Sequence, residues 1–158
     1  MMSIVFAAAV SAALAGPCEV ATAQEAERVL GEASVPVPPE LMGEETAPSC
    51  IWATAQREKE VKISVWSEAE LPVVGMKDAA AYYAKMKADT TGAAAMPGLG
   101  DQAFAMFDGG NKAASGLVAV LKGDRLITFE FGRVNQVQAK AFVAAVMGQK
   151  KRLKRQER

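Results

Sequence analysis

Polar and apolar residues alternate over 60–66, and a short apolar run occupies 49–55, so two neighbouring strands are predicted there. If Ala55 lies opposite Glu60, Trp52 lies opposite Ile63 and Cys50 opposite Val65. One face then carries Cys50, Trp52, Val61, Ile63 and Val65, and the other carries Ile51, Lys62, Ser64 and Trp66. A one-residue slip would move every side chain to the opposite face, so the pattern itself favours this alignment.

Three more strands are predicted further along the chain, at 102–107, 117–122 and 125–131. Gly123-Asp124 separates the last two and is typical of a two-residue hairpin turn. In that hairpin, one face carries Val118, Val120, Ile127 and Phe129, and the other carries Leu117, Ala119, Leu121, Leu126 and Thr128. Both faces of the hairpin are therefore apolar.

Helices are predicted at three places. The first follows Thr22, because Glu25 lies three residues later at capping-box spacing, and Gly31 ends it. A second helix covers 78–88, and a third begins after Asn135 with Val137 and Ala141 on its inner side. The Pro-rich segment 35–39 must be extended, since proline fixes φ, and 40–48 continues as an acidic loop.

The predicted order is α-β-β-α-β-β-β-α, which indicates an α+β fold. We expect an antiparallel sheet of about five strands with helices packed on one face. Residues 16–149 are expected to form a single domain, followed by a basic C-terminal tail at 150–158.

Residues 1–15 are predicted to be a signal peptide, because they are apolar, too short to span a bilayer as a helix, and end in Ala13-Leu14-Ala15. A buried N-terminal helix is the alternative. Export implies a periplasmic or secreted protein in which Cys18 and Cys50 form a disulfide, whereas a cytosolic protein would keep two free thiols. Lipid anchoring would need a displaced cleavage, since Pro17 precedes Cys18.

Charge and composition narrow the function classes. The tail 150–158 carries six basic side chains and one acidic one, which leaves an acidic body in a chain of net charge zero and argues against nucleic-acid binding. The tail suits weak contact with an anionic membrane or polymer, or a solvated helix end. The chain has no histidine, which excludes Ser-His-Asp and Cys-His sites, and two cysteines are too few for an all-cysteine zinc site. We expect no cofactor and no metal.

Several short motifs occur in a fixed order. They are Pro17-Cys18, Glu25-Ala26, Leu30-Gly31, Cys50-Ile51-Trp52, Gly98-Leu99-Gly100-Asp101-Gln102-Ala103 and Gly123-Asp124. In these motifs the chain resembles small exported bacterial envelope proteins of unknown function, best known as actinobacterial lipoproteins. The resemblance implies an exported α+β domain with Cys18 joined to Cys50, and it brings no catalytic residues. That family looks lipidated through a separate upstream cysteine, which is missing here.

Two groups of residues are candidates for binding. An apolar second face with Trp66, Leu117, Leu121 and Leu126 suits a partner surface, unless the Pro-rich loop or the tail covers it. A cavity near Trp52, Met86 and Met106 suits a small apolar ligand, because methionine adapts to irregular shapes, although Trp52 also suits the core.

Candidate catalytic groups are few. Asp101 follows a glycine and either orients a substrate or caps its own loop. Glu40, Glu44 and Glu45 either form paired carboxylates for hydrolysis or belong to a solvated acidic loop. We assign no catalytic residue. The sequence favours an exported, non-enzymatic envelope binding or interaction module whose partner is an unknown envelope protein. The alternatives are a carrier of a small apolar ligand and a histidine-free hydrolase.

Overall fold

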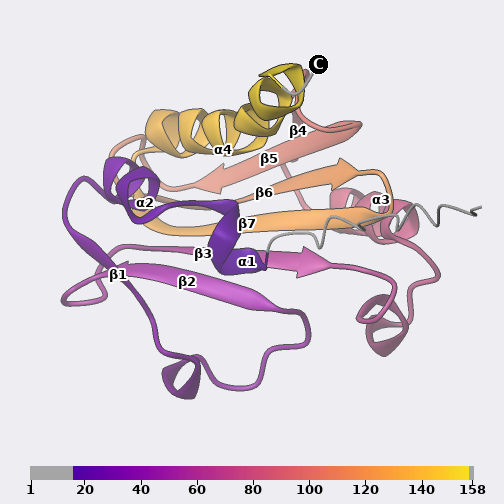
Figure 1. Cartoon of the computed structure of the whole chain (residues 1–158), viewed down its shortest axis with the longest axis horizontal. Coiled ribbons are helices and arrows are strands. Elements are labelled where there is room, and N and C mark those ends of the chain that lie inside the picture. Colours follow the sequence, from indigo (N-terminus) through magenta and orange to yellow (C-terminus); the bar gives the residue numbers. More distant parts are fainter. Residues whose placement is uncertain (1–15, 157–158) are drawn as a thin grey trace, which may run out of the picture.

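The structure is a computed structural model that describes residues 16–156, with side chains for 16–148. In this range seven strands form one antiparallel sheet in the order β1-β2-β3-β7-β6-β5-β4 (Figure 1). The strands are β1 (Ser34–Pro36), β2 (Ser49–Thr54), β3 (Glu60–Trp66), β4 (Ala94–Ala95), β5 (Gln102–Asp108), β6 (Ala114–Lys122) and β7 (Arg125–Val134). The expected α+β class with an antiparallel sheet is confirmed.

The expected number of strands and the element order were wrong. Both extra strands are short and lie at the edges of the sheet, where β1 pairs with β2 and β4 pairs with β5. β1 contains Pro36, which lacks an N–H group and is therefore tolerated at an edge. A short helix, α1 (Pro17–Val20), also precedes the first expected one.

Helices cover both faces of the sheet, so the expectation of helices on one face was wrong. On one face lie α1, α2 (Ala23–Leu30) and α4 (Gln136–Gln156). On the other face α3 (Ala79–Asp89) and the 3-10 turn η2 (Leu71–Val74) pack over β5, β6 and β7. The reason is that both faces of these strands are apolar and each needs a cover.

The larger core lies beneath α1, α2 and α4. Its centre is aromatic, with the ring of Phe142 from α4 edge-on to Phe129 and Phe131 of β7. The smaller core lies beneath α3, where Tyr83 packs on Phe104 of β5 and covers Leu126. A third apolar cluster joins the extended segment and the 3-10 turn η1 (Pro39–Leu41) to the edge of the sheet through Val37, Met42, Ile51 and Ala53.

Local capping signals are confirmed. The Thr22 hydroxyl accepts from the N–H of Glu25, and the Glu25 carboxylate accepts from the N–H of Thr22 at 2.8 Å, which completes the capping box. Gly31 ends α2 in the left-handed conformation, with φ of 77°. The side chain of Asn135 accepts from the N–H of Gln138 at the start of α4. However, Val137 is 69% exposed and Ala141 is also exposed, so the expected inward position of both residues was wrong.

The alignment of β2 with β3 differs from the expected one by two residues. Cys50 lies opposite Ile63 and Trp52 opposite Val61. A shift of two residues keeps every side chain on its expected face, which explains how the faces were predicted correctly while the pairing was not. The Gly123-Asp124 hairpin is confirmed, since Lys122 pairs with Arg125.

The disulfide between Cys18 and Cys50 is present and joins α1 to β2, with the two Cα atoms 5.0 Å apart. Cys50 is buried in the larger core. The link therefore fixes the start of the described chain to the first residues of β2. Without such a link, a chain end tends to fray.

The predictions of a signal peptide and of a basic tail concern the two ends of the chain. The predicted signal peptide, residues 1–15, lies outside the described residues. The backbone of α4 continues through Gln156, so the basic segment starts within a helix. None of the described helices is both long and apolar enough to cross a membrane.

Candidate functional site

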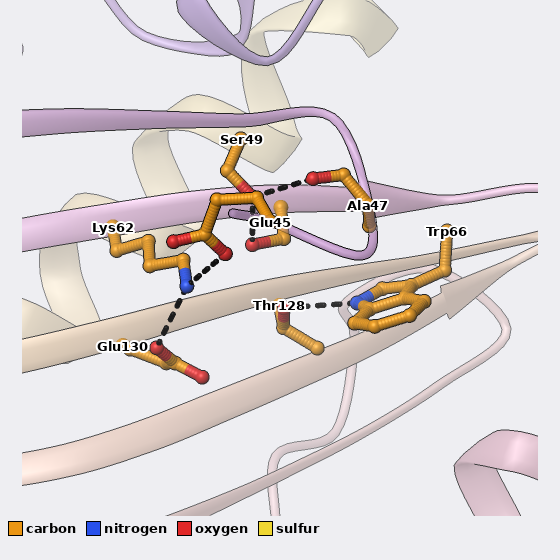
Figure 2. Close-up of polar contacts among 8 residues, drawn as sticks. Glu45, Ala47, Ser49, Lys62, Trp66, Thr128 and Glu130 are labelled. Atoms are coloured by element: carbon orange, nitrogen blue, oxygen red, sulfur yellow. Dashed lines mark hydrogen bonds and ion pairs between the residues drawn. The ribbon is translucent and has the colours of Figure 1, made fainter. Parts of the chain in front are cut away.

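Polar side chains gather on the sheet face that also carries α3, at the pairing of β2, β3 and β7. Two rows run across these strands. Ser49, Ser64 and Thr128 lie opposite one another in one row, and Ile51, Lys62 and Glu130 in the next. We call the polar strip the set Glu45, Ser49, Lys62, Ser64, Trp66, Thr128 and Glu130; Figure 2 labels all of them except Ser64.

A lysine between two carboxylates forms the charged half of the polar strip. Lys62 Nζ lies 2.6 Å from Glu45 Oε2 and 3.9 Å from Glu130 Oε2 (Figure 2). The side chains of Lys62 and Glu45 are 22% and 26% exposed, whereas that of Glu130 is 57% exposed. Lys62 is thus held mainly by Glu45, and Glu130 keeps most of its surface open to solvent.

In the hydroxyl half of the polar strip, the donor and the acceptor of each hydrogen bond can be assigned. Ser49 Oγ donates to the carbonyl oxygen of Ala47 at 2.9 Å and lies 2.8 Å from Ser64 Oγ. Because a hydroxyl has one proton, Ser64 donates to Ser49. Trp66 Nε1 lies 3.4 Å from Thr128 Oγ1 and donates to it. The buried hydroxyls of Ser64 and Thr128 therefore both have partners.

Trp66 connects the polar strip to α3. Its ring meets Tyr82 edge-on, with ring centroids 5.0 Å apart. Burial raises the pKa of the Tyr82 phenol, and the negative charge of Glu130 raises it further. Tyr82 therefore stays protonated at neutral pH and remains a hydrogen-bond donor near Glu130.

A cavity of about 380 Å³ adjoins the other side of the polar strip. The loop that precedes β2 forms it, and its lining includes Pro39, Met42, Glu45, Ala47 and Ser49. Glu45 and Ser49 belong to both the cavity and the polar strip, so a polar ligand group in the cavity can reach strip residues.

The predicted partner surface is covered. Leu121 and Leu126 are buried, Trp66 and Leu117 are half-buried, and all four pack in the cluster beneath α3. Helix α3 covers this face, whereas the sequence had suggested the Pro-rich loop or the tail as its cover. Leu121 and Leu126 are therefore core residues, because an apolar sheet face is stable only when another element packs on it and buries it.

The predicted ligand cavity around Trp52, Met86 and Met106 is wrong, because the sheet separates these residues. Trp52 is buried in the larger core. Met86 packs in the cluster beneath α3, and Met106 lies opposite Leu117, which belongs to that same cluster. Trp52 therefore lies on one face and the two methionines on the other.

Asp101 connects two turns. Its Oδ2 accepts from the N–H of Gly123 at 2.7 Å, and its own N–H donates to the carbonyl of Leu121 at 2.8 Å. The carboxylate thus holds the β6–β7 turn. The sequence-based alternative that Asp101 caps its own loop was wrong. Asp101 also lines a hollow of about 180 Å³ with Tyr83, Lys87 and Gln102.

The acidic loop contributes one residue to the polar strip. Glu45 reaches Lys62, whereas Glu40 and Glu44 form no ion pair with the described residues. Within the described part of the chain, no group of three His, Cys, Asp or Glu side chains is placed to hold a metal ion. No pattern in the sequence indicates the polar strip, because Glu130 meets Lys62 only through the pairing of β3 with β7, and Glu45 reaches Lys62 from the loop before β2.

Comparisons with family models, with curated proteins and with solved structures found no match. The resemblance to exported envelope proteins therefore stays a prediction carried by the motifs around Cys18, Cys50 and Asp101. The structure shows the disulfide that this resemblance implies, but a single disulfide does not identify a family.

Proposed function

We propose that the protein is an extracytoplasmic, non-enzymatic binding module that recognises a partner protein of the cell envelope through the polar strip. The disulfide supports the location, because such bonds persist in oxidising compartments and are rare in the cytosol. The apolar amino terminus of the sequence supports it independently.

The observation that carries the proposal is the position of Glu130 beside Lys62. Glu130 is mostly exposed, its cation partner is 3.9 Å away, and Lys62 is bound more closely by Glu45. A carboxylate held on a rigid strand in this way offers a fixed acceptor to an incoming Arg or Lys. The partner therefore presents a basic side chain to Glu130.

The arrangement of the hydroxyls supports binding over catalysis. Ser64 donates its proton to Ser49, and Ser49 donates to a backbone carbonyl, so neither hydroxyl faces a general base. Lys62 is paired with a carboxylate. A nucleophile without an activating base is weak, and the chain has no histidine to act as one.

Neutralising the charges of the polar strip should strongly weaken partner capture. In a pull-down from envelope extract, the double variant Lys62→Gln/Glu130→Gln should recover the partner about tenfold less than wild type, because a charged hydrogen bond contributes about 1.5–3 kcal/mol. The matched control is Lys59→Gln/Glu32→Gln, which removes an exposed ion pair with a 3.1 Å separation elsewhere on the surface.

Quantitative mass spectrometry of the captured proteins decides the outcome. A partner that wild type and the control retain but the strip variant loses supports the proposal. Equal recovery of the same proteins by all three would contradict recognition through the polar strip. Matching circular dichroism spectra establish that the variants are folded.

A further inference from the structure

A second cavity lies on the opposite side of the sheet, between α2 and α4, and has a volume of about 410 Å³ (Figure 1 shows the two helices on one face). Its apolar lining is Val29 from α2 with Ala141, Phe142 and Ala145 from α4. Glu25, Arg28 and Gln138 supply the polar lining. This volume lies within the range of small-molecule sites, about 300–1,000 Å³.

Two alanines create this space. Ala141 and Ala145 are four residues apart and so lie on one side of α4, facing the cavity. The neighbouring positions Ala139, Val143 and Val146 are buried in the core instead. Since an alanine side chain is a single methyl group, α2 and α4 cannot close the gap that larger residues would fill.

The cavity lining contains one acidic side chain, Glu25, and one basic side chain, Arg28. The Glu25 carboxylate is already committed to the capping box, where it accepts from the N–H and hydroxyl of Thr22. Arg28 is exposed and forms no ion pair with any other described residue. Its guanidinium carries several donors in a planar fork that suits a carboxylate.

We propose that the α2–α4 cavity binds an amphipathic anion, a carboxylate on a single hydrocarbon chain. The chain lies against Val29, Phe142 and the two alanines, and the carboxylate pairs with Arg28 at the rim. The apolar lining supplies affinity through burial of methylene groups, and Arg28 selects the charge of the head group. This site does not rest on the polar strip, which lies on the other face of the sheet.

The probes are dodecanoate, dodecanol and dodecyltrimethylammonium, which share a chain length and differ in head-group charge. Each is titrated into the isotope-labelled protein below its micelle concentration and followed by amide chemical shifts. Wild type should show saturable shifts in α2 and α4 with dodecanoate. Dodecanoate should bind about tenfold more tightly than dodecanol, as expected for one charge-assisted hydrogen-bonded pair.

Three variants separate the cavity from the surface. Ala145→Leu fills the cavity and should weaken dodecanoate binding by at least about tenfold, since it removes the space for several methylene groups. Ala144→Leu is the matched control, because Ala144 is exposed on α4 but does not line the cavity. It should leave the affinity within about twofold of wild type, since no contact with the ligand is changed. Arg28→Gln should lower the affinity for dodecanoate to that of dodecanol and leave dodecanol binding unchanged.

Three results would overturn this assignment: no saturable shift in α2 and α4, an equal effect of both leucine variants, or equal binding of the cationic probe. Leucine has a high helix propensity, so α4 should keep its structure in both leucine variants. Because no partner protein is present in the titration, its outcome is independent of the pull-down.

Discussion

Replacing Cys50 with serine should lower the free energy of unfolding by about 2–4 kcal/mol while the fold is retained. The disulfide joins residues 32 positions apart. Its removal raises the conformational entropy of the unfolded chain and so stabilises the unfolded state. Equilibrium urea denaturation followed by circular dichroism measures the loss.

Reduction provides the control for this expectation. Wild-type protein under reducing conditions should lose about as much stability as the variant, and Cys18→Ser should match Cys50→Ser, because all three remove the same link. If a reductant left the unfolding midpoint of the wild type unchanged, the disulfide would contribute nothing to stability.

Replacing Gly100 with alanine should lower the free energy of unfolding by about 3 kcal/mol. Gly100 has φ of 53°, a conformation that costs other residues about 1–2 kcal/mol. A Cβ atom there would also lie 2.4 Å from the carbonyl oxygen of Leu121, which belongs to rigid backbone. Overpacking of this kind typically costs about 1–3 kcal/mol. Thermal and urea denaturation both report the change.

Gly98 separates the two causes. It also has positive φ, 84°, but an added Cβ would meet nothing within 4 Å. Gly98→Ala should therefore lose only the conformational part, about 1–2 kcal/mol. Equal losses in the two variants would mean that the close approach of Gly100 to β6 is unimportant.

The Gly98–Asp101 segment shows why a motif that suggests a ligand site can be structural. Gly100 allows the chain to approach β6, and Asp101 then holds the β6–β7 turn through the N–H of Gly123. From sequence alone, nothing indicated that residues 101 and 123 meet. Their contact depends on the pairing of β5 with β6, which is a long-range feature.

Local features of the fold were predictable. The capping box of Thr22 and Glu25, the end of α2 at Gly31 and the hairpin at Gly123 depend on neighbouring residues. The faces of the strands were also predictable, because side chains alternate with a period of two. These features need no knowledge of which strands are adjacent.

Features set by tertiary packing were missed. The helical pattern of α4 suggested Val137 and Ala141 as inner residues, but both are exposed, and the sheet buries Ala139 and Val143 instead. The position of α3 was also missed, because its alanines and tyrosines show no strong apolar stripe. The helix lies where Phe104 and Leu126 need a cover, and only the assembled sheet reveals that need.

The polar strip belongs to the same class of missed features. Lys62, Ser64 and Trp66 were correctly placed on one face, but their partners Thr128 and Glu130 come from a strand more than sixty residues away. Without the β3–β7 pairing these residues read as an ordinary solvated face. The pairing turns them into a fixed array of donors and acceptors beside Tyr82.

The central claim, an exported domain closed by the Cys18–Cys50 link, is tested most directly by the intact mass of protein freshly isolated from its source. The protein is denatured without reductant in the presence of a thiol alkylator. We predict no alkylated cysteine before reduction and two after it, together with loss of the apolar residues 1–15 from the mature chain. Two alkylated cysteines before reduction, on a chain that still carries its first fifteen residues, would contradict both the link and export.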